Sequence, residues 1–386
     1  MKNHFYLTGA QVVLEKETLQ KAAVLIADGH IVAIDPASSE GAKEIDLHGH
    51  ILMPGMIDLH CDALEKEAEP RPGVHFPFDF ACAQADKRNA AAGITTVYHA
   101  LSFANAELGV RNNTTAAELA RAVHAWKVHA LVDNRVHARY EITDPTAPAT
   151  LHELLSNDEI HLMSFMDHTP GQGQFKSIEA YRNFQARTYK KDAAEFEALL
   201  AEKLAQGEGA VARMEQLAQT ARGLGIPLAS HDDDRPEKID VVKALGVAVS
   251  EFPINLETAQ TARAAGLATL FGAPNILRGK SQSGSMRALD AVMQGVADCL
   301  CGDYSPAALL PAVMQLPSLA NISLHEAVSL VTSNPARAVG LHDRGVIAPG
   351  KRADLLAVRY LGGLPQAARV WSKGITVMAL AFDHGA

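Results

Sequence analysis

Four apolar runs in this 386-residue chain each end in residues that can bind a metal ion. The first run, 53–59, leads directly into His60, and Asp62 follows two positions later. Residues i and i+2 of a β-strand point to the same side, so this imidazole and this carboxylate can share one ion. The other three runs are followed by Asp167 and His168, by His231, and by Asp303. Four runs of one form predict a ring of strand ends around a metal site.

The candidate ligands at these and one further strand end are His60, Asp62, Glu141, His168, His231 and Asp303. Mixed imidazole and carboxylate sets suit Zn, Mn, Fe or Ni better than Ca or Mg. Six ligands exceed one tetrahedral site, so the set indicates two divalent ions, with Glu141 as the bridging carboxylate. Asp303 is the natural residue to bind one ion and to carry the proton of the attacking water. Taken singly, His168 and His231 are more often polar core residues, and Asp303 could cap a helix near Pro306.

Strands and helices alternate through the middle of the chain, which is typical of a parallel α/β fold. Eight segments are predicted to be strands: 56–60, 95–100, 134–142, 160–167, 226–230, 247–251, 268–272 and 298–302. Eight such units in about 290 residues predict a (β/α)8 TIM barrel, whose active site lies where the strands end. The segment 177–224 is too long for one crossover helix. It predicts an inserted helical pair, either a lid or a solvated decoration.

The two ends of the chain have a different pattern from the middle. Both contain short strand-like segments separated by turn signals, such as Asp28-Gly29 between two apolar runs. They predict one small β-sandwich assembled from residues 1–53 and 344–386, which flanks a barrel formed by residues 54–343.

Basic and small polar residues surround the predicted metal site. Lys66 and Arg71 follow the first strand, and two cations at the mouth of such a site suit phosphate. The segment 272–285 after the seventh strand is hydroxyl-rich and basic, in the region where TIM barrels often bind phosphate. As an isolated pattern it is equally an ordinary turn-rich loop. The candidate substrate-binding residues are Lys66, Arg71, Arg139, Asn275, Arg278, Lys280, Ser281 and Ser283.

Composition narrows the class of protein. A formal net charge of −9 argues against binding to nucleic acid, which requires a basic face. The N-terminus has no apolar leader segment, and no stretch is long enough to span a bilayer. Four cysteines are too few and too irregularly spaced for a disulfide framework, so they predict buried thiols in a reducing compartment. We therefore expect a cytoplasmic protein with a small phosphorylated substrate and no membrane or nucleic-acid partner. The sequence leaves open whether the protein forms a homo-oligomer.

Several motifs resemble the amidohydrolase superfamily of metal hydrolases: Pro54–His60, Gly302-Asp303 and the tail from Asn334 to Asp354. Within that superfamily the chain resembles the PhnM family of the carbon–phosphorus lyase pathway. The motifs shared with this family lie at 64–66, 70–72, 92–97, 164–172, 229–233, 251–253, 272–275, 278–279 and 303–304. The resemblance covers about residues 54 to 355.

The resemblance implies hydrolysis of α-D-ribose 1-methylphosphonate 5-triphosphate to the 5-phosphate and pyrophosphate. It implies a metal-bound hydroxide that attacks the phosphorus nearest the ribose, with Asp303 as the proton shuttle. All six candidate ligands occupy matching positions, and this match supports Glu141 in particular. The family, like this chain, has Asp at position 62, where the superfamily more often has His.

The chain departs from the family pattern at Ala63, His99, Gln282 and Ser285, where the family usually has Asn, Asp, His and Asn. His99 is either an extra ligand or a changed contact, and the other changes concern the substrate rather than the metal chemistry. His168 and His231 end the fourth and fifth predicted strands, whereas the superfamily commonly uses the fifth and sixth. Either a strand is miscounted, or Glu251 holds a place that is more often held by His.

Two alternatives to a diphosphatase stay open. The same metal centre could cleave a C–N bond in an amide, a cyclic amide or a deaminase-type substrate, as most of the superfamily does. The chain could also be a degenerate barrel that serves as a subunit of an assembly. Cations facing the active site would favour phosphate: Lys66, Arg71, Arg139, Arg278 and Lys280.

Overall fold

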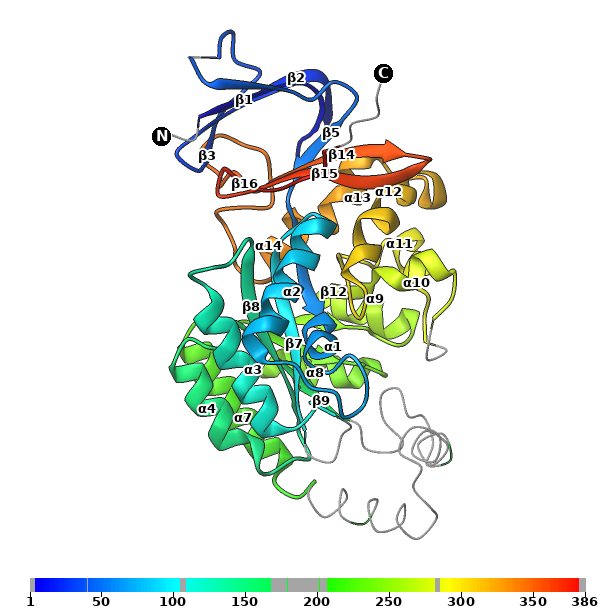
Figure 1. Cartoon of the computed structure of the whole chain (residues 1–386). Coiled ribbons are helices and arrows are strands. Elements are labelled where there is room, and N and C mark those ends of the chain that lie inside the picture. Colours follow the sequence, from blue (N-terminus) through cyan, green and yellow to red (C-terminus); the bar gives the residue numbers. More distant parts are fainter. Residues whose placement is uncertain are drawn as a thin grey trace.

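The computed structural model of this chain describes residues 4–39, 41–104, 109–167, 179, 201, 207–281 and 285–381. His168, Gln282, Ser283 and most of the predicted 177–224 insertion lie outside these residues, so these predictions are not addressed by the structure. Figure 1 shows the central domain below a separate sheet that contains strands from both ends of the chain.

Eight parallel strands form the central domain, and they correspond to the eight predicted segments. They are β6 (Met56–Cys61), β7 (Ile94–Phe103), β8 (Asp133–Glu141), β9 (Leu162–Met166), β10 (Leu228–His231), β11 (Val247–Glu251), β12 (Ala268–Gly272) and β13 (Cys299–Cys301). They pair in sequence order, and the last returns to the first. There Asp303 N–H donates to the His60 carbonyl and Asp62 N–H to the Asp303 carbonyl, each at 2.9 Å. The predicted TIM barrel is therefore confirmed.

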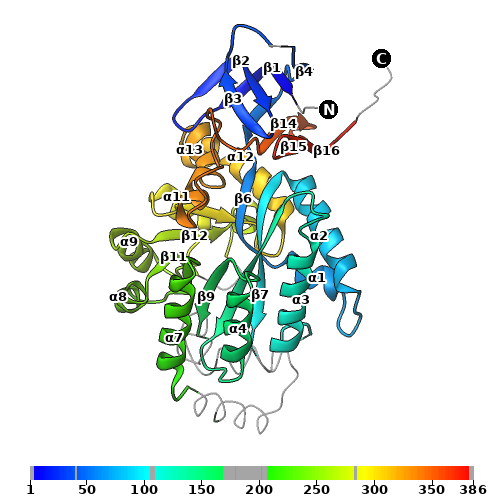
Figure 2. The same cartoon turned by 90° about the vertical axis from the view of Figure 1, so that its left-hand side faces the viewer.

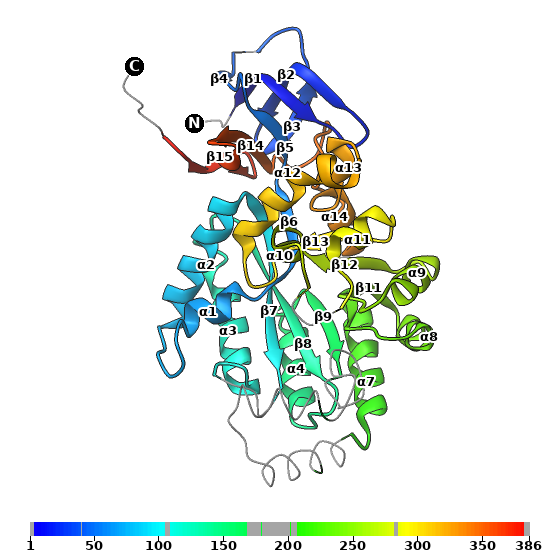
Figure 3. The same ribbon diagram turned by 90° about the vertical axis from the view of Figure 1, so that its right-hand side faces the viewer.

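Helices pack around the outside of this barrel (Figures 2 and 3). They are α1 (Ala63–Ala68), α2 (Phe78–Ala92), α3 (Asn113–Trp126), α4 (Ala147–Ser156), α7 (Ala210–Gly223), α8 (Pro236–Ala244), α9 (Leu256–Ala264), α10 (Ala273–Arg278), α11 (Ala288–Met293), the 3₁₀ turn η1 (Pro306–Ala308), α12 (Leu309–Ala320), α13 (Leu324–Ser329) and α14 (Ser333–Ala338). Helices cover one side of the strands and the barrel interior lies on the other, so nearly every residue of β6, β7 and β9 is buried. None of the described helices combines the length and the apolar character needed to cross a bilayer.

The two ends of the chain form one further sheet. Its strands are β1 (Phe5–Val13), β2 (Thr18–Ala27), β3 (His30–Ile34), β4 (Lys43–Asp46), β5 (Ile51–Pro54), β14 (Leu355–Leu361), β15 (Leu364–Ser372) and β16 (Ile375–Ala379). Antiparallel pairing of β5 with β14 joins the two halves. Leu7 and Ile26 from the first half share one buried cluster with Leu355 and Trp371 from the second. The sheet built from both termini is therefore confirmed, while the exact boundaries 53/54 and 343/344 stay predictions.

A buried ion network closes the barrel at the amino ends of its strands. Asp133, the first residue of β8, accepts from Arg344 at 2.5 Å and from Arg135 at 3.1 Å. Arg352 pairs with Asp354 and lies 3.8 Å from Asp133. Burial alone would raise the pKa of Asp133, but the surrounding guanidinium groups hold this pKa well below its usual range. Each carboxylate here has an arginine, so the network stabilises the fold.

Candidate active site

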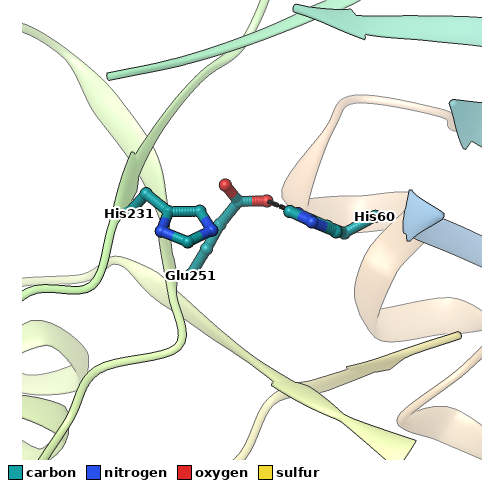
Figure 4. Close-up of side chains that lie close together, drawn as sticks. All are labelled: His60, His231 and Glu251. Carbon is teal, nitrogen blue, oxygen red and sulfur yellow. Dashed lines mark hydrogen bonds and ion pairs between the residues drawn. The ribbon is translucent and has the colours of Figure 1, made fainter. Parts of the chain in front are cut away.

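Ligand-type side chains meet at the opposite end of the barrel, where β6, β10, β11 and β13 end. Two groups place one ligand atom of each residue within 4.8 Å of the others, among the residues that the structure describes. One consists of His60, Asp62 and Asp303, and the other of His60, His231 and Glu251. Figure 4 shows the second group, in which Glu251 lies between the two imidazoles. His60 belongs to both groups and is the centre of the site.

His60 lies between two carboxylates. Its Nδ1 is 3.2 Å from Glu251 Oε1, and its Nε2 is 3.4 Å from Asp62 Oδ1. Burial lowers the pKa of His60, but the two carboxylates more than offset this and raise it to about 10. Without an ion, the raised pKa favours an imidazolium that donates to Glu251 and forms an ion pair with Asp62. A divalent ion would take the place of the Nε2 proton, because a metal ligand must offer its lone pair. The donor set of imidazole and carboxylate groups thus fits a divalent transition ion.

Asp62 and Asp303 are neighbouring carboxylates in different environments. Asp62 is 3.4 Å from Arg139 and 3.5 Å from Arg111. Burial alone would raise its pKa, but Arg139, His60 and Arg111 hold the pKa well below the usual range. The pKa of Asp303 is raised, by burial first and then by the charge of Asp62. A pair with pKa values shifted in opposite directions is the pattern of a fixed anion beside a proton carrier.

The backbone is strained at three of these strand ends. Asp232, Phe252 and Asp303 have φ angles of 52°, 53° and 52°, in the left-handed region that bulky residues rarely adopt. The Phe252 ring packs against both imidazoles, 5.0 Å from His60 and 5.2 Å from His231 between ring centres. Strain of this kind costs on the order of 1 kcal/mol or more per residue and concentrates at functional sites.

Two predicted ligand positions stand apart from these groups. Glu141 ends β8, is buried, and accepts from Thr143 at 2.8 Å. It belongs to neither ligand group within the described part of the chain, so its bridging role stays a prediction. His99 lies inside β7, and its Nε2 is 2.9 Å from Asn134 Oδ1. This position favours the changed contact over the extra ligand.

The strand count settles the position of Glu251. Because the structure has the eight predicted strands, β11 is the sixth, and Glu251 ends it in the place that is more often held by His. His137 was not predicted to matter, since it lies in the middle of β8 and not at the strand end, where the ligands were expected. Arg111 was missed because it follows β7 in a loop without a recognisable motif.

A cavity of about 620 Å³ lies over the ligand groups. Four of the five predicted cations line it, together with Arg111: Lys66, Arg139, Arg278 and Lys280. Asn275, Ser281 and Ser285 also line it, as predicted for the first two. Arg71 is exposed and is not among the described lining residues; its contact is a backbone bridge to Val74. The cation set predicted around the site is therefore present without Arg71.

Some of the cavity cations are fixed by ion pairs, and others have no ion-pair partner among the described residues. Arg111 donates at 2.7 Å to the buried Glu65, whose other oxygen accepts from Ser102 N–H at 3.2 Å. Arg278 donates to the Tyr304 hydroxyl at 3.2 Å. Lys66, Arg278 and Lys280 form no ion pair with any described residue, so their charges are available to an anionic ligand. Asn275 accepts from Ala288 N–H at 3.0 Å and braces the segment that carries Arg278.

Comparison with known proteins defines the class. A model of the amidohydrolase family matches residues 51–379, so the chain belongs to the amidohydrolase family and is a metal-dependent hydrolase. The fold agrees: N-acetyl-D-glucosamine-6-phosphate deacetylase from Mycobacterium smegmatis superposes with a TM-score of 0.65 at 16% identity, over 97% of this chain and 100% of that one.

Sequence relatives are more specific. The α-D-ribose 1-methylphosphonate 5-triphosphate diphosphatase of Escherichia coli K12 is 34% identical over 373 residues, which cover 95% of this chain and 98% of that protein. The resemblance to the PhnM family is thereby confirmed. An adenine deaminase of Cereibacter sphaeroides is 28% identical over 364 residues, which cover 89% of this chain and 53% of the deaminase.

Proposed function

We propose that this protein hydrolyses a phosphoanhydride bond of a ribose 5-triphosphate, of the α-D-ribose 1-methylphosphonate 5-triphosphate type, and releases pyrophosphate. The cation-lined cavity above the ligand groups is the observation that carries this proposal. A triphosphate brings several negative charges into a site where three cations have no carboxylate partner among the described residues. The activity named for the Escherichia coli relative supports the same substrate class.

The proposed cofactor is a pair of divalent ions, Zn, Mn, Fe or Ni. His60, Asp62, His231 and Asp303 would hold them, with Glu141 and His168 as the further predicted ligands. When bound, such ions activate water and neutralise the charge of the phosphoryl group.

The side chains of the cavity have separate tasks. Asp303 takes the proton of the attacking water on its carboxylate, because it lines the cavity and its raised pKa suits a proton carrier. Arg139 and Arg111 fix Asp62 beside His60. Lys66, Arg278 and Lys280 bind the phosphates and stabilise the charge that develops on the leaving pyrophosphate.

A second candidate is hydrolysis of a C–N bond by the same centre. The likeness to an adenine deaminase favours it, since that relative covers 89% of this chain. A neutral amide or ring would leave the three cavity cations that have no ion pair with a described residue without a role, so we rank it second.

The location that we propose is the cytoplasm. The cysteines Cys61, Cys82, Cys299 and Cys301 are all free and buried, which supports a reducing compartment. We propose a small phosphorylated molecule as the partner, and a homo-oligomer stays open.

Pyrophosphate release tests the proposal. The protein loaded with Mn or Zn would be incubated with ribose-triphosphate esters, ATP included, while bound metal is measured in the same samples. We expect pyrophosphate and about two ions per chain. Two bound ions without pyrophosphate, together with turnover of C–N substrates, would establish the second candidate instead.

A further inference from the structure

We propose that Glu251 is a positioning residue, which acts on the metal centre through His60 from beneath the cavity and is not itself a ligand. This inference rests on the metal centre of the proposed function. Glu251 ends β11, where a histidine ligand would otherwise be expected, so its task is not evident from its place on the strand.

Glu251 lies behind His60 and not beside the substrate. It is fully buried, and it does not line the cavity, whereas His60 and His231 do. Its Oε1 is 3.2 Å from His60 Nδ1 (Figure 4), whereas Asp62 lies 3.4 Å from Nε2 of the same ring. The carboxylate can only accept here, so Nδ1 carries a proton.

This contact fixes which nitrogen of His60 faces the cavity. An ion beside Asp62 and Asp303 binds the Nε2 lone pair, and the one remaining proton must then lie on Nδ1. Glu251 accepts that proton and holds the ring in one tautomer and one orientation. A carboxylate behind a ligating histidine also makes the imidazole a stronger donor to the ion.

His137 defines the other side of Glu251. Its Nδ1 is 3.0 Å from the Leu59 carbonyl, which can only accept, so Nδ1 carries the proton of the neutral ring. Its Nε2 then accepts from the Ser164 hydroxyl at 2.8 Å. The same Nε2 is 3.6 Å from Glu251 Oε2 and has no proton to donate. Glu251 Oε2 accordingly has no hydrogen-bond donor in the described structure, and the hydrogen bond of Glu251 is the one from His60 Nδ1 to Oε1.

Glutamine at position 251 separates this role from direct ligation. An amide oxygen can still accept from His60 Nδ1, and the amide N–H would face His137 Nε2, where it competes with the Ser164 hydroxyl for the one lone pair. The positioning role therefore survives Glu251→Gln. A ligand role does not, because a neutral amide is a much weaker ligand for a transition ion than a carboxylate. Glu251→Leu removes both roles at similar volume.

The experiment measures Zn affinity by competition with a chromogenic chelator, with no substrate present. We expect Glu251→Gln to bind within about threefold of the wild type, and Glu251→Leu to bind about 10- to 100-fold more weakly. Asp86→Asn is the matched control, since Asp86 is also a buried carboxylate. It accepts hydrogen bonds from Trp126, Leu131 and Asn134 and contacts none of the candidate ligands that the structure describes. Its Zn affinity should equal that of the wild type.

Loss of Zn affinity in Glu251→Gln equal to that in Glu251→Leu, with circular dichroism unchanged in both, would overturn the positioning role. So would a wild-type affinity in Glu251→Leu. Because the readout needs no substrate, a correct affinity pattern without pyrophosphate release would refute only the proposed reaction. Pyrophosphate release with the wrong pattern would refute only the role of Glu251.

Discussion

The two ends of the barrel both bury charged side chains, but they balance these charges differently. At the amino ends, Asp133 and Asp354 face Arg135, Arg344 and Arg352, so every carboxylate has a guanidinium partner. At the carboxyl ends, Asp303 and Glu251 join Asp62 around His60, and the carboxylates outnumber the imidazolium between them. The balanced end holds the chain together, whereas at the other end Arg139 and Arg111 pair with Asp62 but not with Asp303 or Glu251, and the donor set fits a cation from outside.

This difference separates stability from activity within one fold. A paired network loses stability when one member is removed, because the remaining charge is buried alone. A cluster with more carboxylates than cations can instead bind a metal ion. The strained backbone conformations at Asp232, Phe252 and Asp303 lie at this same end, as is typical of a functional site. Substitutions at the two ends should therefore change different measurements.

The largest effect is expected at the carboxyl end. Asp303→Asn should lower kcat by about 10²- to 10⁴-fold, because the amide cannot carry the proton. The amide oxygen is a weaker ligand than the carboxylate, but at saturating metal most of the ion should stay bound and the melting temperature should change little, since His60 and Asp62 remain. Kinetics and metal analysis on the same preparation check this, and near-normal turnover would remove Asp303 from its proposed role.

At the amino end, Asp133→Asn should lower the free energy of unfolding by about 3 kcal/mol, with kcat and bound metal unchanged. The folded-state pKa of Asp133 is lowered, so its contribution is present above the unfolded pKa of about 3.9 and is lost as the pH falls through the folded value. Urea titrations should therefore show the full difference at pH 7 and a smaller one at pH 3. A difference that grew toward acid pH would contradict the pairing.

Removal of metal should affect the carboxyl end alone. A chelator is expected to lower the stability of the wild type by about 2–3 kcal/mol, the linkage free energy for an ion at roughly 100 times its dissociation constant. Asp133→Asn should show the same chelator-induced shift on top of its own loss, since the two ends are independent. Calorimetry with and without chelator measures both, and a smaller shift in the variant would show that the ends are coupled.

The smallest effect concerns the cavity rim. Arg278→Ala should raise KM for a triphosphate ester about tenfold with little change in kcat, because one charged contact to phosphate is lost. Arg121→Ala is the control, since Arg121 forms an exposed ion pair with Glu153 on the helix side of the barrel. Equal KM values for the two variants would exclude Arg278 from phosphate binding.

The eight barrel strands were predictable because strand-like segments alternate with helical ones along the chain, although polar residues interrupt the apolar run in β8. β4 was not, since its sequence Lys-Glu-Ile-Asp is polar and it pairs at the edge of β1. His60, Asp62, His231 and Asp303 were predictable because each ends or follows a strand. The contact of His60 with Glu251 was not, because these residues are 191 positions apart and meet only when the barrel closes.

The left-handed backbone at position 303 has a consequence for saturation mutagenesis. Asp and Asn adopt positive φ far more readily than other residues with a side chain, so a library at this position would measure backbone tolerance together with chemistry. Only the Asp–Asn pair isolates the carboxyl group. Phe252 has the same conformation. Glycine at this position would relieve the backbone strain but remove the ring that packs against His60 and His231. Loss of the ring, which also packs against a buried cluster, costs more stability than relief of the strain returns, so a selection for stability alone would keep Phe252.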